Sequence, residues 1–161
     1  MTLRRYKIKE GKFDEERMDM GEIKSLVAKN KAHLGDLLKE RGRMEAAVLE
    51  YRRALNEAGD SVPIMNKLSS ALMAISRNEE ALEILKRAKA ISPDHPTIHT
   101  ALGQTYLKLN DYKQAKESFW TSLEINPFNP EVHLGLATAY EQLGDWTSSL
   151  KERGIAKKLI P

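Results

Sequence analysis

The stretch from Pro96 to Asn129 decides the fold, and it reads PTIHTALGQTYLKLNDYKQAKESFWTSLEINPFN. It contains two short amphipathic patterns of helical period, separated by the turn-forming pair Asn110-Asp111 and closed by Pro127. Proline suits the first turn of a helix, where its missing N–H has no partner in the helix anyway, so Pro96 marks a helix start. The stretch therefore predicts two antiparallel helices joined by a tight turn.

The same pattern recurs every 34 residues over residues 28–161. In the first helix of each 34-residue unit, a large residue is predicted to fill the layer between repeats. These residues are Leu34, Leu68, Leu102 and Leu136, and a small residue directly follows each of them. Small residues also recur in the second helices at Ala47, Ala81, Ala115 and Ser149. The closing positions are Gly59, Pro93, Pro127 and Pro161. One helix pair cannot bury its apolar face alone, so the period predicts pairs that stack on their neighbours.

These residues resemble the tetratricopeptide repeat family, whose pattern places Leu-Gly, Tyr, Ala, an aromatic residue and Pro at set offsets in 34 residues. The best match is Leu102-Gly103, Tyr106, Ala115, Phe119, Ser122 and Pro127. The resemblance implies an all-α fold, a right-handed α-solenoid of antiparallel helix pairs. It covers residues 28–161 as four units, 28–61, 62–95, 96–129 and 130–161.

Two segments precede the repeats. Residues 1–13 are basic and lack a helical apolar stripe, which predicts a flexible tail, with a docking arm for an acidic partner as the alternative. Residues 14–27 are expected to form an N-terminal helical extension. It would start at Asp14 or Asp19, because the helix dipole favours acidic residues at an N-terminus.

The composition excludes several classes of protein. The 161 residues carry a net charge of only +3 with the charges interspersed, whereas a nucleic-acid binder would concentrate them in a basic stripe. There is no cysteine, which excludes disulfides, thiol nucleophiles and Cys-based zinc sites. No apolar run approaches the length of a membrane span. The compartment stays open, with the cytoplasm favoured.

No catalytic constellation, cofactor motif or metal-ligand spacing emerges, so we expect a protein that is not an enzyme. His99 and His133 stand one repeat apart, at a position that is usually aromatic in the family the chain resembles. We interpret them as partly buried substitutes for an aromatic ring.

Function is therefore expected to reside in surface shape. The resemblance implies that first helices line a concave groove, which holds an extended peptide or a partner helix. The corresponding residues are Asn66, Ser70, Met73, Thr97, Thr100, Gln104, Leu107, Lys108, Leu134, Thr138 and Glu141. The polar ones are suited to hydrogen bonds with a peptide, and Met73, Leu107 and Leu134 to apolar pockets.

Three interpretations of the whole chain remain at this point. The leading one is a non-catalytic scaffold or adaptor that binds a protein or peptide partner in the groove. The second is a structural module that forms homo-oligomers through open solenoid ends, since Arg153 stands where Tyr51, Leu85 and Phe119 stand in the other repeats. The third is a regulatory or targeting domain cut from a larger enzyme.

Overall fold

Helices make up most of the chain in the computed structural model, which describes residues 4–9 and 12–160. The chain divides between Gly59 and Asp60 into two compact units. Residues 1–3 and 10–11 of the expected tail lie outside the described residues, as does the last closing position, Pro161.

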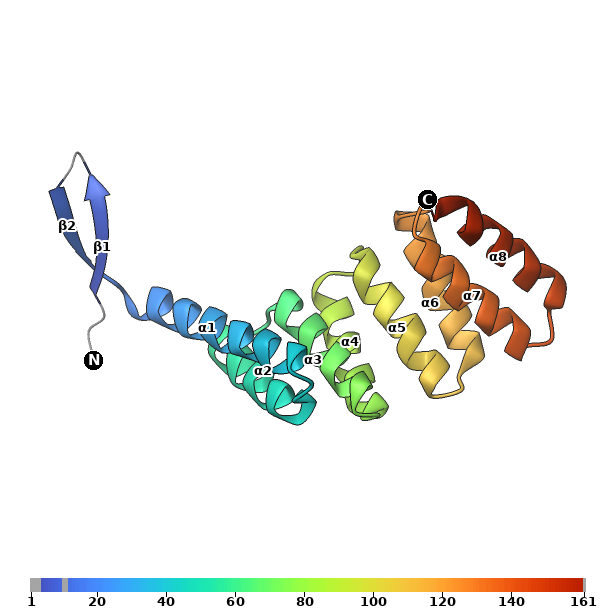
Figure 1. Cartoon of the computed structure of the whole chain (residues 1–161), viewed down its shortest axis with the longest axis horizontal. Coiled ribbons are helices and arrows are strands. Elements are labelled where there is room, and N and C mark those ends of the chain that lie inside the picture. The colour runs from blue at the N-terminus through green and yellow to red at the C-terminus, as the bar shows by residue number, and fades with distance from the viewer. Residues whose placement is uncertain (1–3, 10–11, 161) are drawn as a thin grey trace. The chain divides into compact units, whose positions relative to one another are not determined.

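The first unit contains one helix pair, α1 (Met20–Glu40) and α2 (Met44–Ala58), which lie side by side in Figure 1. A capping box starts α1. The Asp19 carboxylate accepts the Glu22 N–H at 2.7 Å, and the Glu22 carboxylate accepts the Asp19 N–H at 3.1 Å. Between the helices, Tyr51 of α2 is fully buried against Gly35 of α1.

The first unit also contains two strands, β1 (Arg4–Lys9) and β2 (Lys12–Arg17), paired antiparallel. The sequence led us to expect a flexible tail up to residue 13 and a helix starting at Asp14 or Asp19. The strands differ from this expectation, and the helix starts at the later of the two residues. The register sets Arg5 opposite Glu16 and Lys7 opposite Asp14. Residues 14–17 are thus in a strand, and the helix begins only at Met20, after the Asp19 cap.

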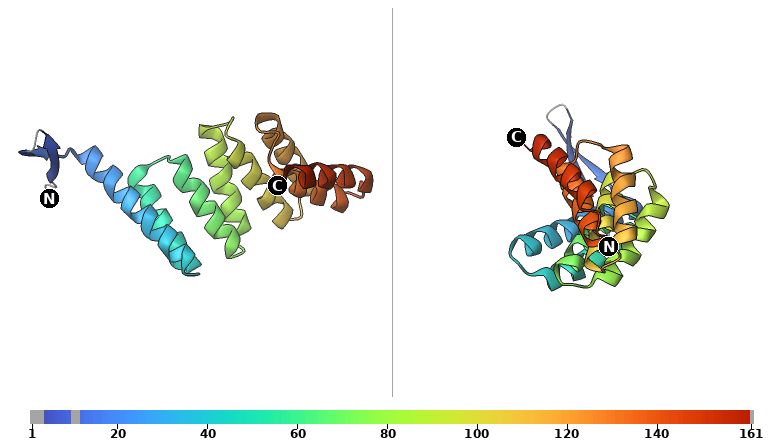
Figure 2. Two further views of the ribbon diagram at one scale, coloured as in Figure 1. Left: turned by 45° about the horizontal axis from the view of Figure 1, so that its top comes forward. Right: turned by 90° about the vertical axis from the view of Figure 1, so that its right-hand side faces the viewer.

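The second unit consists of three helix pairs in chain order. They are α3 (Val62–Ala74) with α4 (Asn78–Ile91), α5 (Pro96–Lys108) with α6 (Tyr112–Ile125), and α7 (Pro130–Gln142) with α8 (Trp146–Leu159). Figures 1 and 2 show them following one another from green to red. The helix pairs predicted from the repeat are present, which confirms the all-α class and the antiparallel pairs.

The turn inside each pair has the same backbone conformation. Its left-handed residues are Gly42, Ser76, Asn110 and Gly144, with φ of 72°, 60°, 59° and 82°. They stand 34 residues apart, so the repeat extends to backbone dihedral angles. Glycine and asparagine adopt this conformation most readily, which explains three of the four.

Small residues make room for an aromatic ring at the centre of the second unit. A Cβ atom on Gly103 of α5 or on Gly135 of α7 would lie 2.5 Å from the ring of Phe119, which belongs to α6. The ring is fully buried with Val132 and Leu136 of α7 in one core cluster. Phe119 of α6 thus connects its own helix pair, α5 and α6, to the next pair, α7 and α8.

The first repeat departs from the predicted packing at one leucine. Leu136 is fully buried, whereas the equivalent Leu34 on α1 is 45% exposed. In the described residues, α7 follows a complete helix pair, but α1 follows only the two strands. Leu34 therefore does not fill an interior layer as predicted.

Candidate functional site

The predicted groove residues come from the first helices of the second unit, α3, α5 and α7, and α5 contacts the other two. We call the side of these helices that carries Ser70, Gln104 and Thr138 the first-helix face. These three residues occupy equivalent positions of successive repeats, and each is half-buried. They form a row of small or uncharged polar side chains across three helices.

Side-chain hydrogen bonds connect successive helices on this face. The Asn66 amide of α3 donates to the Thr97 hydroxyl of α5 over 3.3 Å, and the Gln104 amide of α5 donates to the Glu131 carboxylate of α7. Thr97 and Glu131 are equivalent residues of consecutive repeats, and both are exposed. Thus α5 presents an oxygen acceptor to an amide of α3, and α7 presents one to an amide of α5.

Other predicted residues complete the accessible part of the face. Lys108 and Leu134 are exposed. The Thr138 hydroxyl donates to the Leu134 carbonyl at 3.0 Å, which orients the side chain along its own helix. The accessible set therefore comprises Asn66, Ser70, Thr97, Gln104, Lys108, Leu134 and Thr138.

Thr100 lies behind this face. Its side chain is buried, and its hydroxyl lies 3.1 Å from the Pro96 carbonyl oxygen and 2.9 Å from the Ser122 hydroxyl of α6. These contacts join α5 to α6.

The two apolar residues at the centre of the predicted set also pack inward. Met73 is buried, with its Sδ 3.0 Å from the Thr105 hydroxyl, and Leu107 packs against the cluster around Phe119. Their contacts stabilise the helix packing, and the first-helix face is correspondingly more polar than the sequence suggested.

Glu141 is directed toward α8. Its carboxylate accepts from the Ser149 hydroxyl at 2.8 Å and from the Arg153 guanidinium at 2.8 and 2.9 Å. The Ser149 hydrogen bond, followed by those from Arg153, holds the pKa of Glu141 below its ordinary value. The carboxylate is therefore ionised at neutral pH and engaged within the second unit.

Sequence reasoning missed a buried ionisable pair between α7 and α8. His133 Nδ1 lies 2.6 Å from a carboxylate oxygen of Glu152, and His133 Nε2 lies 3.1 Å from the Pro127 carbonyl oxygen. His99, one repeat earlier, makes the equivalent contact to the Pro93 carbonyl. The histidines are buried as predicted, but their rings serve as hydrogen-bonding groups. The signal was the helical spacing of Ser149, Glu152 and Ala156, which places Glu152 on the buried side of α8.

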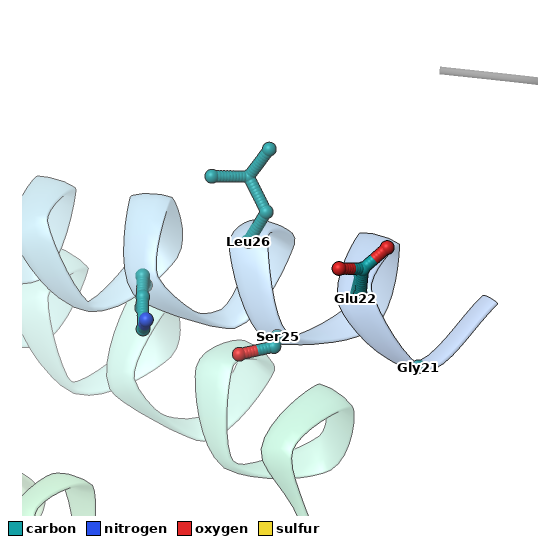
Figure 3. Close-up of a pocket in the computed structure, with 5 residues that line it drawn as sticks. Gly21, Glu22, Ser25 and Leu26 are labelled. Atoms are coloured by element: carbon teal, nitrogen blue, oxygen red, sulfur yellow. The ribbon is translucent and has the colours of Figure 1, made fainter. Parts of the chain in front are cut away.

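An open pocket of about 310 Å³ lies on the first turns of α1, lined by Gly21, Glu22, Ser25, Leu26 and Lys29. Figure 3 shows Leu26 and Glu22 extending from the helix on the side away from Ser25. All five lining residues belong to one helix, so this surface hollow does not gather groups from several elements and has no catalytic arrangement.

Across the described part of the chain, no three His, Asp or Glu side chains are grouped as metal ligands. Within the same residues, no helix combines the length and apolar character that a membrane span requires.

Models of the tetratricopeptide repeat family match residues 38–105, 72–119 and 100–152. Together these matches cover most of the chain, including α2 to α7 completely. No curated protein matches the chain.

Solved structures resemble the chain in fold. A crystal structure of MamA has a TM-score of 0.76 at 19% identity, over 88% of this chain and 95% of that one. MamA from Desulfovibrio magneticus RS-1 has a TM-score of 0.76 at 17% identity, over 82% and 75%. A thermophilic repeat protein of Thermus thermophilus, TTC0263, has a TM-score of 0.75 at 23% identity, over 83% and 74%. At these identities the likeness concerns the helical-repeat architecture alone.

Proposed function

Because this chain belongs to the tetratricopeptide repeat family, a family of protein-interaction scaffolds, we propose that it binds a peptide or a partner helix on its first-helix face. The observation that carries the proposal is the row Ser70, Gln104 and Thr138, together with the amide–acceptor pairs beside it. The row continues over three helices without an uncompensated charge cluster. It therefore suits the uncharged N–H and C=O groups of a polypeptide backbone.

The amide–acceptor pairs support binding because an oxygen of a bound partner can replace the acceptor in each pair. Asn66 and Gln104 have amide groups that donate to accessible oxygens, Thr97 and Glu131, at the rim of the face. A bound backbone carbonyl can take the place of either acceptor with little loss of hydrogen bonding. Such an exchange costs less than creating an interaction site from buried groups that already have fixed partners.

We propose a non-catalytic role for the same surface. It combines hydroxyl, amide and single charged groups, and none of the accessible residues forms the nucleophile–base pair that acyl or phosphoryl transfer uses. Binding selectivity then arises from Lys108 at one end of the face and Leu134 on α7, which offer a charge and an apolar contact.

The test is a comparison of captured proteins. The double variant Gln104→Lys with Thr138→Lys introduces two charges on the first-helix face, so we expect it to lose the partners that the unaltered chain captures from an extract of its source cells. Quantitative mass spectrometry measures the loss.

A matched control is available on α6. Gln114→Lys with Thr121→Lys makes the same two chemical changes, and the Thr121 hydroxyl bonds the backbone of its own helix as that of Thr138 does. The control should retain the partners. Capture of the same proteins by all three chains would show that the first-helix face does not bind them.

A second candidate function is self-association through α1. Its residues Leu26, Leu34 and Leu37 fall on one side of the helix by their spacing, and all three are exposed. Apolar residues gathered on one side mark an association surface. Light scattering at several protein concentrations tests this. Leu34→Asp should lower the average mass if α1 mediates assembly, and Leu49→Asp, at an exposed leucine of α2, is the control.

A further inference from the structure

A second surface lies on α8, beside the side that packs on α7. Five residues at alternating spacings of four and three follow one line along this side: Trp146, Leu150, Arg153, Lys157 and Ile160. Trp146 is 64% exposed, Leu150 70% and Ile160 53%. The other side of α8 packs on α7 through Ser149, Glu152 and Ala156, and the two helices lie side by side in Figure 1. We call the exposed line the α8 stripe.

The equivalent stripe on α6, one repeat earlier, is covered by the next helix. The equivalent residues of α6 are Tyr112, Lys116, Phe119, Leu123 and Asn126. There α7 covers the stripe, so that Phe119 and Leu123 are buried and Lys116 Nζ lies 5.8 Å from the ring centre of Tyr140. The α6 stripe is therefore a helix-docking surface with its occupant in place. Among the described residues, nothing occupies the α8 stripe in the same way.

The α8 stripe differs in charge from the equivalent stripe of α6. Arg153 replaces Phe119, and Lys157 replaces Leu123. The Arg153 side chain pairs with Glu141 yet stays 47% exposed, and Lys157 is exposed. The carboxylate of Glu152 points to the buried His133 of α7 and away from the stripe, so it does not neutralise the stripe. Along the stripe, the apolar Trp146 and Leu150 are followed by the cationic Arg153 and Lys157, and the apolar Ile160 ends it.

We propose that the α8 stripe docks an amphipathic, acidic helix of a partner protein. The apolar side chains of that helix would cover Trp146 and Leu150, and its carboxylates would lie against Arg153 and Lys157. We expect the partner helix to pack on α8 as α7 packs on α6. The cations of the stripe favour a partner helix that carries acidic residues. Two copies of α8 are a poor match, because stripes laid face to face would bring four cations together. This surface is distinct from the first-helix face and binds independently of it.

The experiment uses the full chain and two labelled helical peptides of the length of α7. The acidic probe carries leucine and glutamate along one side at the spacing of the stripe, and the basic probe carries lysine in place of each glutamate. Fluorescence anisotropy should show saturable binding of the acidic probe alone. That binding should weaken as salt is added, because exposed charges are screened.

Charge reversal locates the site. Lys157→Glu should weaken binding of the acidic probe at least about tenfold, because a repulsive contact replaces an attractive one. Lys158→Glu makes the same change on the neighbouring residue, which points about 100° away around the helix, and should leave the affinity unchanged. Leu150→Asp should abolish binding, whereas Phe128→Asp, at an exposed aromatic residue outside the stripe, should not.

Any of the following results would overturn the proposal. They are no saturable binding of the acidic probe, equal binding of both probes, equal loss in Lys157→Glu and Lys158→Glu, or a dimer of the unaltered chain that Leu150→Asp dissociates. The variant Gln104→Lys with Thr138→Lys should bind the probe normally. A loss there would place the probe on the first-helix face and also refute the assignment to α8. Circular dichroism checks that every variant is folded.

Discussion

His133 and Glu152 form a buried contact between α7 and α8, with 2.6 Å between Nδ1 and the carboxylate oxygen. Both ring nitrogens of His133 face acceptors, because Nε2 lies 3.1 Å from the Pro127 carbonyl oxygen. The pair thus satisfies two buried polar groups that would otherwise destabilise the helix pair.

Removing one partner should therefore be costly. We expect Glu152→Ala to lower the free energy of unfolding by about 1–3 kcal/mol, because a buried ring nitrogen of His133 would lose its hydrogen-bond partner. Urea denaturation followed by circular dichroism measures the change. Glu124→Ala, at an exposed position of α6, should cost little. Equal losses in the two variants would show that the contact does not stabilise the fold.

Gly103→Ala should destabilise the second unit by about 1–3 kcal/mol, because its new methyl group would press on the buried ring of Phe119. Gly154 offers the opposite case. It lies within α8, where a Cβ atom would meet nothing within 4 Å. Gly154→Ala should stabilise by about 0.5–1 kcal/mol through helix propensity. Thermal unfolding of the two variants should therefore shift in opposite directions.

The left-handed turn at Gly144 provides a test of backbone conformation alone, because a Cβ atom there would contact nothing. Gly144→Ala should lose about 1 kcal/mol from the strained dihedral angle. Gly144→Asn should lose less, since asparagine tolerates this conformation and Asn110 adopts it one repeat earlier. Similar denaturation midpoints for the two variants would contradict this explanation.

Tyr51 predicts a dependence of stability on alkaline pH. Burial of the side chain raises the pKa of its phenol well above the ordinary value, and the hydrogen bond to Asp36 at 2.8 Å adds to the shift. The folded state therefore favours the protonated phenol. Its contribution is complete below the ordinary tyrosine pKa of about 10 and is lost as the pH rises from there toward the raised folded-state value.

Stability should accordingly fall above about pH 10, and Tyr51→Phe should remove part of that fall. Urea midpoints measured across this range give the slope for each chain. Tyr112→Phe, which removes a hydroxyl bonded to Asn110, controls for the loss of a phenol as such. An unchanged slope in Tyr51→Phe would show that this phenol does not carry the effect.

The features that recur in every repeat could be predicted from the sequence, and those that occur only once were missed. Helix bounds and turns follow from residues that recur every 34 positions, such as Leu102 and Asn110, so one well-formed repeat specifies the others. The Glu152 contact was missed because its equivalent in α6 is Ser118, and a single substitution leaves no periodic signal. The paired strands were missed for a similar reason, since residues 4–17 lie outside the 34-residue repeats and have no periodic signal.

The predicted face was least accurate where equivalent residues have different neighbours. Asn66, Thr100 and Leu134 occupy the same repeat position, yet Asn66 is half-buried, Thr100 buried and Leu134 exposed. The Ser122 hydroxyl behind Thr100 determines its position. Position within a repeat therefore fixes the helix and the turn, but the side chain of the adjacent helix decides whether a residue is accessible.

The ring of Phe119 has a consequence for how the second unit comes apart. Its contacts with Gly103 and Gly135 belong to two different helix pairs, so neither pair can open without exposing the same ring. In a stacked array, cooperativity is set by the free energy of such shared interfaces. The pairs α5–α6 and α7–α8 should consequently lose their hydrogen-exchange protection together, as a single opening event, instead of fraying one after the other.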